Sequence, residues 1–314
     1  MKTRAEVEEA YRSYLAGREE QPFAMDGIVV KVDDLALRRL LGEGARAPFW
    51  AAARKFPPPT AETVVRSIRW SVGRTGRRTP IAEVVPVRLG GVLVGRISLH
   101  DANEVARLDI AAGDRVVVGL IGDVIPRVLQ VADRAPRHGN AGGGPSVTAP
   151  TPDACLRDGP GCREQFLSRL VHFVARPGLH IAGLGRGRLQ KLVEAGLVAD
   201  LPSLFRLRTE EVAAVPGFGG KTAQQLTAAL GNSRRFGQFR MVAALGIPGV
   251  GRVSTKRLAG RFRTLRALLD LDEDRLTVRC GADVRGARLI RSFFRTSGGR
   301  DLLEEFRGMG MFPN

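Results

Sequence analysis

Hydrophobic and polar positions follow two different patterns along the chain, and the change falls near its middle. In the first half, short β-branched runs are separated by Gly, Pro and Asp at the spacing of a small antiparallel barrel. Residues 3–20 instead have the periodicity of an amphipathic helix. The predicted strands are residues 28–32, 64–72, 81–87, 92–99, 115–120 and 124–131.

In the second half, apolar residues recur at helical spacing, and glycines precede the runs. The helices predicted there include residues 187–194, 221–230, 254–262 and 287–294. This half is therefore predicted to be nearly all helix.

A glycine motif repeats through the helical half. Its copies are Gly183-Leu184-Gly185, Gly217-Phe218-Gly219 and Gly249-Val250-Gly251, spaced by 34 and 32 residues, with Gly281-Ala282-Asp283 a further 32 residues on. Such a turn leaves backbone N–H groups unobstructed at a helix N-terminus, which makes a phosphate cradle without sequence preference. Ordinary glycine caps would explain one such turn, but four at a near-constant period favour the repeated cradle. In the fourth copy, Asp283 would present a carboxylate to a phosphate, and we expect that hairpin to be structural.

The charge of the chain indicates what kind of partner it binds. The formal net charge of +17 divides into +1 for residues 1–60, +4 for 61–150 and +12 for 151–314, and 43 of the 49 basic residues are Arg. An excess of this size in a chain able to fold favours a polyanionic partner. A ribosome-like protein, or arginine enrichment through codon bias, remains the alternative. Residues 134–152 are dense in Gly and Pro and are predicted to form a linker.

The sequence also excludes several classes of protein. No apolar run approaches the length of a membrane span, and the first 25 residues do not have the order of a signal peptide. Three cysteines, Cys155, Cys162 and Cys280, cannot form a disulfide framework for a chain of this size. We therefore expect a cytoplasmic protein in a reducing compartment.

Candidate chemistry is concentrated in residues 25–34 and 52–57. Asp26 opens a predicted strand, and Lys31 and Lys55 stand 24 residues apart at strand ends. Two ammonium groups and a carboxylate are the groups that phosphoryl chemistry requires around a polyphosphate and its Mg²⁺. Lysines at strand ends are usually only solvated, so the block taken alone favours an ordinary solvated surface over a catalytic site.

These residues resemble nucleotidyltransferase motifs IV and V of the NAD-dependent bacterial DNA ligases, and the segments that follow resemble the same family in order. Residues 72–76 with Thr79-Pro80 look like the entry to that family's OB barrel, and residues 97–100 and 122–126 look like its later strands. Residues 170–174 and the four hairpins, which resemble helix-hairpin-helix motifs, complete a match from about residue 4 to about 312.

The resemblance implies a multidomain α+β fold. Its expected parts are a partial nucleotidyltransferase (adenylation) domain at 1–60, an OB-fold β-barrel at 61–133, a linker with a degenerate zinc-finger remnant at 134–165, and an all-α helix-hairpin-helix DNA-binding domain at 166–314.

The same resemblance implies roles for single residues. Lys31 and Lys55 would contact the adenylate phosphate, and Asp26 would help to hold Mg²⁺. The expected DNA contacts are Arg74, His100, Gly183, Gly185, Gly217, Gly219, Lys221, Gly249 and Gly251. For His100, simple solvation at a strand end stays open.

Three further residues, Trp50, Trp70 and His172, could either pack in the fold or contact a ligand. Trp50 and Trp70 could stack on nucleotide or DNA bases. For Trp50, which we place in an apolar helical run, packing is favoured. His172, beside Phe173 on a predicted helix face, is interpreted as structural.

In this family a lysine takes AMP from NAD, AMP passes to the 5′-phosphate of a nick, and the 3′-hydroxyl displaces AMP in line. The nucleophile sits in a Lys-x-Asp-Gly motif. None of the lysines, Lys2, Lys31, Lys55, Lys191, Lys221 and Lys256, begins that motif. NAD and Mg²⁺ are thus implied by the family, but NAD use by this chain alone is not expected.

The family's zinc site uses four cysteines, of which only Cys155 and Cys162 remain as remnants, and His138 is a poor substitute. Zinc is therefore not expected. No BRCT-like segment follows the hairpins, which resembles the shorter secondary ligases of the family. Cys280 is interpreted as a packed side chain.

We therefore expect part of an NAD-dependent DNA ligase that binds nicked duplex DNA at the nucleoid and takes part in joining 3′-hydroxyl and 5′-phosphate ends in replication and repair. It would be one half of a split ligase completed by a separately encoded N-terminal half, a truncated gene product, or a protein that seals only DNA already carrying AMP. The alternative is a non-catalytic duplex DNA-binding module, and an RNA-binding protein is more distant.

Overall fold

The computed structural model describes residues 3–23, 25–44, 47–121, 125–136 and 154–312. The chain divides into two compact units, Met1–Trp70 with Pro80–Gly144, and Ser71–Thr79 with Pro145–Asn314. Residues 137–152 of the predicted linker, His138 within it, and residues 122–124 of the predicted barrel motif lie outside the described residues.

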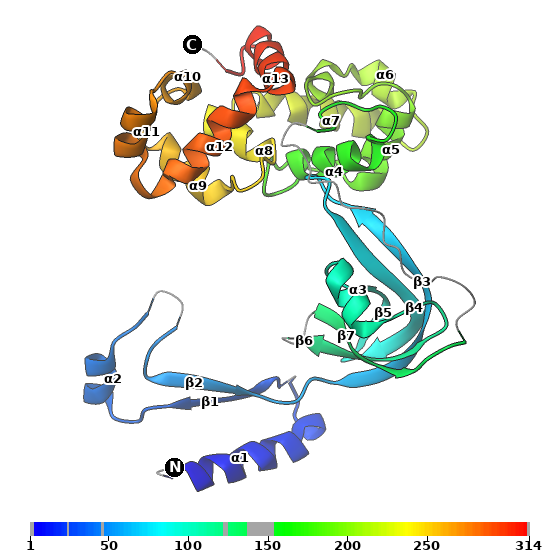
Figure 1. The fold of residues 1–314 in the computed structure, drawn as a ribbon, viewed down its shortest axis with the longest axis vertical. Coiled ribbons are helices and arrows are strands. Elements are labelled where there is room, and N and C mark those ends of the chain that lie inside the picture. The colour runs from blue at the N-terminus through cyan, green and yellow to red at the C-terminus, as the bar shows by residue number, and fades with distance from the viewer. Residues whose placement is uncertain (1–2, 24, 45–46, 122–124, 137–153, 313–314) are drawn as a thin grey trace. The chain divides into compact units, whose positions relative to one another are not determined.

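The N-terminal segment is a helix followed by an antiparallel ribbon (Figure 1). Its elements are α1 (Arg4–Ala16), η1 (Arg18–Glu20), β1 (Gly27–Lys31), α2 (Leu35–Leu41) and β2 (Ala51–Lys55). The Thr3 side chain accepts a hydrogen bond from the Glu6 backbone at the start of α1, and Asp34 caps α2 in the same way. The predicted helix at 3–20 and the predicted strand at 28–32 are thus both present, with slightly different bounds.

The helical run proposed around Trp50 was wrong. Trp50 lies in a turn that leads directly into β2, and residues 51–55 pair with β1 rather than continue a helix. Pairing with a strand about 25 residues earlier overrides the local apolar pattern, which cannot distinguish a short strand from a helix. The Trp50 ring is half-buried under the Arg38 guanidinium, 4.8 Å from the ring centroid.

A five-stranded antiparallel sheet forms the rest of the first unit, in the order β5-β4-β3-β6-β7. The strands are β3 (Thr60–Val72), β4 (Arg78–Leu89), β5 (Val92–Ser98), β6 (Arg115–Ile121) and β7 (Ile125–Asp133). Each strand overlaps one of the predicted strands. Buried residues alternate with exposed ones along the strands, and the buried side chains form a core that includes Val65, Ile97 and Val116.

One helix of this unit, α3 (Ala102–Leu108), lies between β5 and β6 and was not predicted. Asp101 caps it by accepting a hydrogen bond from the Glu104 backbone N–H, 3.1 Å away. An acidic cap followed three residues later by Glu is a helix-start signal, and it would have predicted this element.

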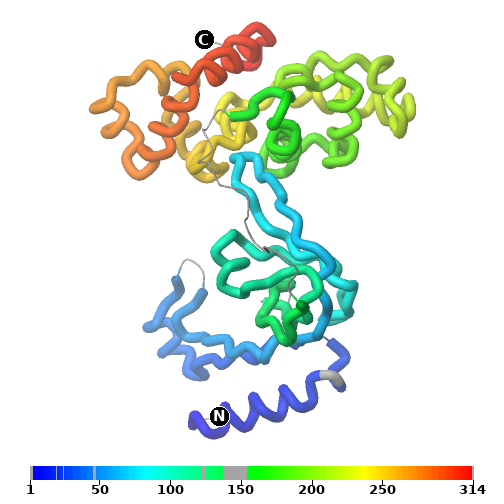
Figure 2. The backbone as a smooth tube through the Cα atoms, turned by 45° about the vertical axis from the view of Figure 1, so that its right-hand side comes forward, coloured from blue at the N-terminus to red at the C-terminus, as the bar shows by residue number. Residues whose placement is uncertain are grey.

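The second unit is helical, as its periodicity predicted (Figures 1 and 2). Its elements are α4 (Arg163–Val174), α5 (Arg186–Glu194), η2 (Pro202–Arg206), α6 (Thr209–Ala213), α7 (Gly220–Ser233), α8 (Gln238–Ala244), α9 (Arg252–Ala259), α10 (Leu265–Leu269), α11 (Glu273–Cys280), η3 (Gly281–Asp283), α12 (Val284–Arg295) and α13 (Ser297–Gly308). Phe173, Phe205 and Phe306 meet in its core, with the Phe173 and Phe306 rings 6.3 Å apart.

The turn between β3 and β4 belongs to this helical unit rather than to the sheet from which it extends. The Ser168 hydroxyl of α4 donates to the Val72 carbonyl over 2.7 Å, and the Gln165 amide donates to the Arg74 carbonyl over 3.3 Å. Side chains of α4 thus satisfy the backbone of a turn about 90 residues earlier.

Candidate nucleic-acid interface and phosphate-binding residues

The first glycine of each hairpin has a left-handed backbone. The φ angles are +82° at Gly183, +91° at Gly217, +77° at Gly249 and +52° at Gly281. Residues with a side chain adopt these angles only with strain, so the chain requires glycine there. The sequence repeat therefore corresponds to a repeated backbone turn.

The second glycine of the first three hairpins stands at the start of a helix. Gly185, Gly219 and Gly251 have extended backbones and precede α5, α7 and α9. A Cβ at any of the three would meet no atom within 4 Å. Space is thus open beside the start of each helix, as an anion cradle at the first backbone N–H groups of a helix requires.

Basic side chains hold two of these hairpins in place. The Lys191 ammonium donates to the Pro216 carbonyl over 2.8 Å, and the Arg188 guanidinium donates to the Gly183 carbonyl over 2.8 Å. Sequence reasoning did not single out either residue. Both lie on α5, one or two turns after a hairpin glycine, and that position could have identified them. Lys221, which was predicted to bind DNA, is exposed at the second position of α7.

The fourth hairpin was expected to be structural because Asp283 replaces its second glycine, and the position of Asp283 agrees with that expectation. Asp283 is 5% exposed, and its carboxylate lies 3.4 Å from the Arg257 guanidinium of α9. The carboxylate points inward because the ion pair connects the fourth hairpin to the helix of the third. The fourth hairpin thus supports the third instead of offering an open cradle.

Arg74 and His100, the predicted contacts outside the hairpins, are both exposed. Arg74 lies in the β3–β4 turn beside His172 and Gly246, and its guanidinium has no ion-pair partner within the described ranges. Burial, together with the charge of Arg74, holds the pKa of His172 below its ordinary value. The half-buried His172 ring also lies 3.3 Å from the Ala243 carbonyl. His100 has a left-handed backbone, with φ of +62°, two residues after the end of β5.

The structure brings Asp26 and Lys55 together and leaves Lys31 apart from them. The Lys55 ammonium pairs with the Asp26 carboxylate, and this hydrogen bond holds the pKa of Asp26 below its ordinary value. Gly27 is opposite Lys55 and Lys31 is opposite Ala51, so both lysines lie on one face of the ribbon. Four residues of strand separate them, roughly 13 Å. The two lysines can therefore neutralise different phosphates on that face, but not one and the same phosphate group.

Helix α1 orders the end of β2 where Lys55 lies. The Tyr11 hydroxyl donates to the Lys55 carbonyl over 3.0 Å, and the Arg54 guanidinium pairs with Glu8 and lies 4.0 Å from the centroid of the Tyr11 ring. The Phe56 ring packs beside Tyr11 at 5.2 Å. Sequence reasoning missed this group of residues, because only the fold brings α1 to residues more than 40 positions later.

These residues alone do not enclose a nucleotide. Every described side chain before Phe56 is at least partly exposed, whereas nucleotide sites are concave and bury most of the ligand. Over the ranges that the structure describes, no three His, Cys, Asp or Glu side chains form a group able to hold a metal ion. The residues present therefore do not fit NAD, and Asp26 would be only one ligand of a Mg²⁺ ion.

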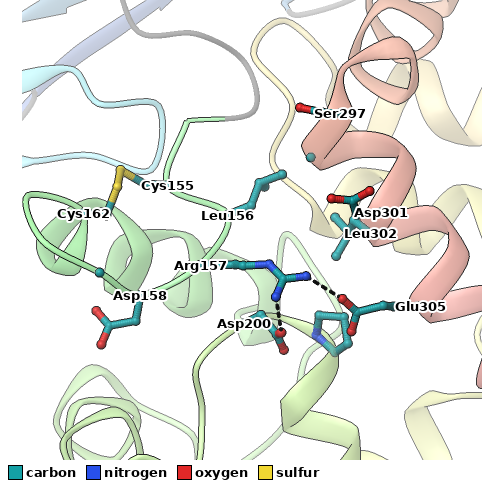
Figure 3. Close-up of a pocket in the computed structure, with 13 residues that line it drawn as sticks. Cys155, Leu156, Arg157, Asp158, Cys162, Asp200, Ser297, Asp301, Leu302 and Glu305 are labelled. Atoms are coloured by element: carbon teal, nitrogen blue, oxygen red, sulfur yellow. Dashed lines mark hydrogen bonds and ion pairs between the residues drawn. A yellow bond between two sulfur atoms is a disulfide. The ribbon is translucent and has the colours of Figure 1, made fainter.

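The two cysteines interpreted as zinc-finger remnants are joined in a disulfide, which the sequence analysis did not predict (Figure 3). The loop between them carries Arg157, whose guanidinium lies 2.7 Å from Glu305 and 3.7 Å from Asp200. A cavity of about 460 Å³ lies beside this loop. The third cysteine, Cys280, is free and fully buried, and burial raises the pKa of its thiol.

Within the described part of the chain, no helix is long and apolar enough to cross a lipid bilayer. Three open hairpins on a basic helical unit, and a five-stranded sheet in the other unit, define a multidomain protein of the OB-fold and helix-hairpin-helix class. The family comparisons agree. Residues 179–232 match a SAM-like helix-hairpin-helix tandem, and residues 240–303 match a helix-hairpin-helix motif.

The particular family follows from the rest of the chain. Residues 1–59 match the adenylation domain of NAD-dependent DNA ligases, and residues 62–140 match the OB-fold domain of the same family. The chain is built from NAD-dependent DNA ligase domains and is homologous to a portion of those enzymes.

Whole-chain relatives support this conclusion. The DNA ligase of Halorubrum lacusprofundi is 42% identical over 96% of this chain and 44% of its own length. The DNA ligase of Alkalilimnicola ehrlichii is 40% identical over 96% of this chain and 47% of its own length. The DNA ligase of Salinibacter ruber is 37% identical over 94% of this chain and 44% of its own length. The chain spans slightly less than half the length of the relatives it matches.

Proposed function

We propose that this chain is the nick-binding and strand-sealing portion of an NAD-dependent DNA ligase that acts in DNA replication and repair. The observation that carries the proposal is the set of three open cradles at Gly185, Gly219 and Gly251 in a chain homologous to DNA ligases. Cradles of this kind grip phosphates without reading sequence, which suits a protein that must act at any break in a duplex. Such work places the protein in the cytoplasm, at the nucleoid.

In the proposed sealing step, the 3′-hydroxyl oxygen attacks the 5′-phosphorus of a nick that carries AMP. A phosphodiester bond forms, AMP leaves with the electron pair of the broken P–O bond, and the hydroxyl proton passes to solvent. Lys31 and Lys55, on one face of the ribbon, would neutralise charge on the phosphates. Asp26 would exchange Lys55 for Mg²⁺, which supplies further charge neutralisation when bound.

NAD would react in another part of the enzyme. The chain contains no Lys-x-Asp-Gly sequence, and its described residues do not enclose a nucleotide. We propose that the part of the enzyme corresponding to the region before this match in the relatives supplies the nucleophilic lysine and the pocket for the nicotinamide end of NAD.

The experiment is sealing of a nicked duplex whose 5′-phosphate already carries AMP, with Mg²⁺ and without NAD. We expect the chain to seal this substrate and Lys55→Ala to lose at least tenfold in rate. The matched control is Arg12→Ala, which removes one exposed positive charge from α1 of the same segment and should change little.

No sealing, combined with tight binding of the same nick, would contradict the proposed sealing role and favour a non-catalytic duplex DNA-binding module. Preference for single-stranded RNA over the nicked duplex would contradict nick binding as well.

A further inference from the structure

Helices α8 and α9, with Phe262 and Arg263 that follow α9, line a cavity of about 620 Å³ in the helical unit, the α8–α9 cavity. Its apolar wall includes Phe239, Ala243 and Phe262, each at most 4% exposed. Val253 also lines it and is 67% exposed. Cavities of this volume with apolar and aromatic walls and few polar groups are typical of ligand-binding sites.

Every charged side chain that lines this cavity is cationic. The four are Arg240 on α8, Arg252 and Lys256 on α9, and Arg263. Over the residues that the structure describes, none of the four has an ion-pair partner. Elsewhere in the helical unit a guanidinium group does find a carboxylate, as Arg257 does at Asp283. The positive charge of the cavity is therefore available to an anion from outside the chain.

Two of these guanidinium groups are held in place without being neutralised. Arg240 donates to the Leu179 carbonyl over 3.1 Å. Arg252 donates to the Arg176 carbonyl over 3.0 Å. A carbonyl oxygen orients a guanidinium group but carries no net charge, so the attraction for an anion remains. Because the two side chains are already ordered, binding an anion costs less side-chain entropy.

The lining residues of α9 lie along one face of the helix. Arg252, Lys256 and Ala259 follow one another at intervals of about one helical turn. Thr255 and Leu258 face the core instead, with exposures of 2% and 0%. At a rise of about 1.5 Å per residue, the lining face is roughly 10 Å long. Positive charge thus extends along the cavity, which fits several anionic groups in a row better than a single one.

Duplex DNA does not match both features of the α8–α9 cavity. Its phosphates would pair with the cations, but its bases are stacked inside the duplex and leave the apolar wall without a partner. A peptide with acidic residues around a large apolar side chain matches both, because the side chain enters the cavity while the carboxylates pair with the cations. Recognition of acidic motifs by arginine clusters is a recurrent mode of peptide binding.

We propose that the α8–α9 cavity binds an acidic peptide segment of a partner protein, anchored by one aromatic or large aliphatic side chain. This inference goes beyond nick sealing and does not depend on it. It gives the helical unit a protein-binding site in addition to the open cradles at Gly185, Gly219 and Gly251.

The test measures, by fluorescence anisotropy with the full chain, binding of a labelled peptide in which a tryptophan stands between two pairs of aspartates. One control peptide has alanine in place of the tryptophan, and the other has asparagines in place of the aspartates. We expect each control peptide to bind at least tenfold more weakly, because the first lacks the apolar anchor and the second lacks the charge.

Two variants test the site on the chain. Ala259→Phe fills the cavity without a change of charge, and its matched control is Ala228→Phe at an exposed position of α7. Arg263→Glu reverses one lining charge, and its matched control is Arg307→Glu at an exposed position of α13. We expect both cavity variants to lose at least tenfold in peptide binding and both controls to change little. Thermal unfolding checks that each variant folds, and if one cavity variant does not, the other decides.

Equal binding of the three peptides, or peptide binding that survives the cavity variants, would overturn the inference. Binding of nicked duplex, measured on the same variants, should be unchanged by Ala259→Phe. A loss of duplex affinity as large as the loss of peptide affinity would assign the cavity to DNA instead. Sealing of a nick that already carries AMP is a separate readout, so failure of the peptide site and failure of the proposed function are distinguishable.

Discussion

At the scale of single residues, the two glycines of each hairpin have different tasks. Gly217 has a φ of +91°, and a Cβ there would collide with the Lys191 ammonium that holds the hairpin. Gly219 has a φ of −87°, and a Cβ there would meet nothing. The first glycine therefore permits the left-handed backbone of the turn, and the second leaves space for a ligand at the start of the helix.

Alanine at the two positions should separate these tasks. Gly217→Ala should lower the free energy of unfolding by about 1–2 kcal/mol, because the left-handed backbone strains any residue with a Cβ. Gly219→Ala should cost less than about 1 kcal/mol and weaken binding of nicked duplex several-fold, because its methyl group stands in front of the open N–H groups. Chemical denaturation and fluorescence anisotropy on the same variants check both effects, and each variant is the control for the other. Equal loss of DNA affinity at equal stability would contradict the division.

At the scale of elements, hydrogen bonds, ion pairs and a disulfide between segments distant in the sequence hold the helical unit together. Ser168 and Gln165 of α4 bind the backbone of the β3–β4 turn, and the Cys155–Cys162 disulfide closes the loop that leads into α4. Arg157 in that loop reaches Asp200 and Glu305 on later elements. The position of helix α4 therefore depends on contacts with residues far from it in the sequence.

The disulfide should contribute measurably to stability. Opening it with a reductant should lower the free energy of unfolding by about 2–3 kcal/mol, because the unfolded chain regains the entropy of a short closed loop. The variant with Cys155→Ser and Cys162→Ser should unfold like the reduced wild type and should not respond to reductant. Thermal unfolding with and without dithiothreitol measures this, and a reductant effect on the double variant would show that the bridge is not its cause.

At the scale of the whole molecule, charge is distributed unevenly along the chain. Residues 151–314 carry +12 of the net +17, while residues 1–60 carry +1. The open cradles and most of the positive charge belong to the helical unit, and the exposed apolar residues of α2 and the ribbon belong to the nearly neutral segment. Duplex binding should therefore be an electrostatic property of the helical unit.

Salt titration tests this distribution. The logarithm of the binding constant for nicked duplex should fall linearly with the logarithm of salt concentration, with a slope of about −0.9 per phosphate neutralised. Lys221→Ala, at the open start of α7, should reduce the slope by about 1. Arg12→Ala in the nearly neutral segment removes the same charge and should leave the slope unchanged, whereas a similar reduction would mean that the N-terminal segment also neutralises phosphates.

The sequence by itself determined most of the elements and their order, since strand alternation, helical periodicity and glycine turns all depend on neighbouring residues, although helix α3 was missed and strand β2 was taken for a helix. The resemblance of its motifs then identified the domains, and the family comparisons confirmed the ligase relationship. Only the tertiary structure decided that Asp283 turns inward to Arg257, that Asp26 pairs with Lys55 while Lys31 stays apart, and that Cys155 binds Cys162. Each of these depends on where the fold directs a side chain or which distant segment it brings near, and local periodicity contains neither.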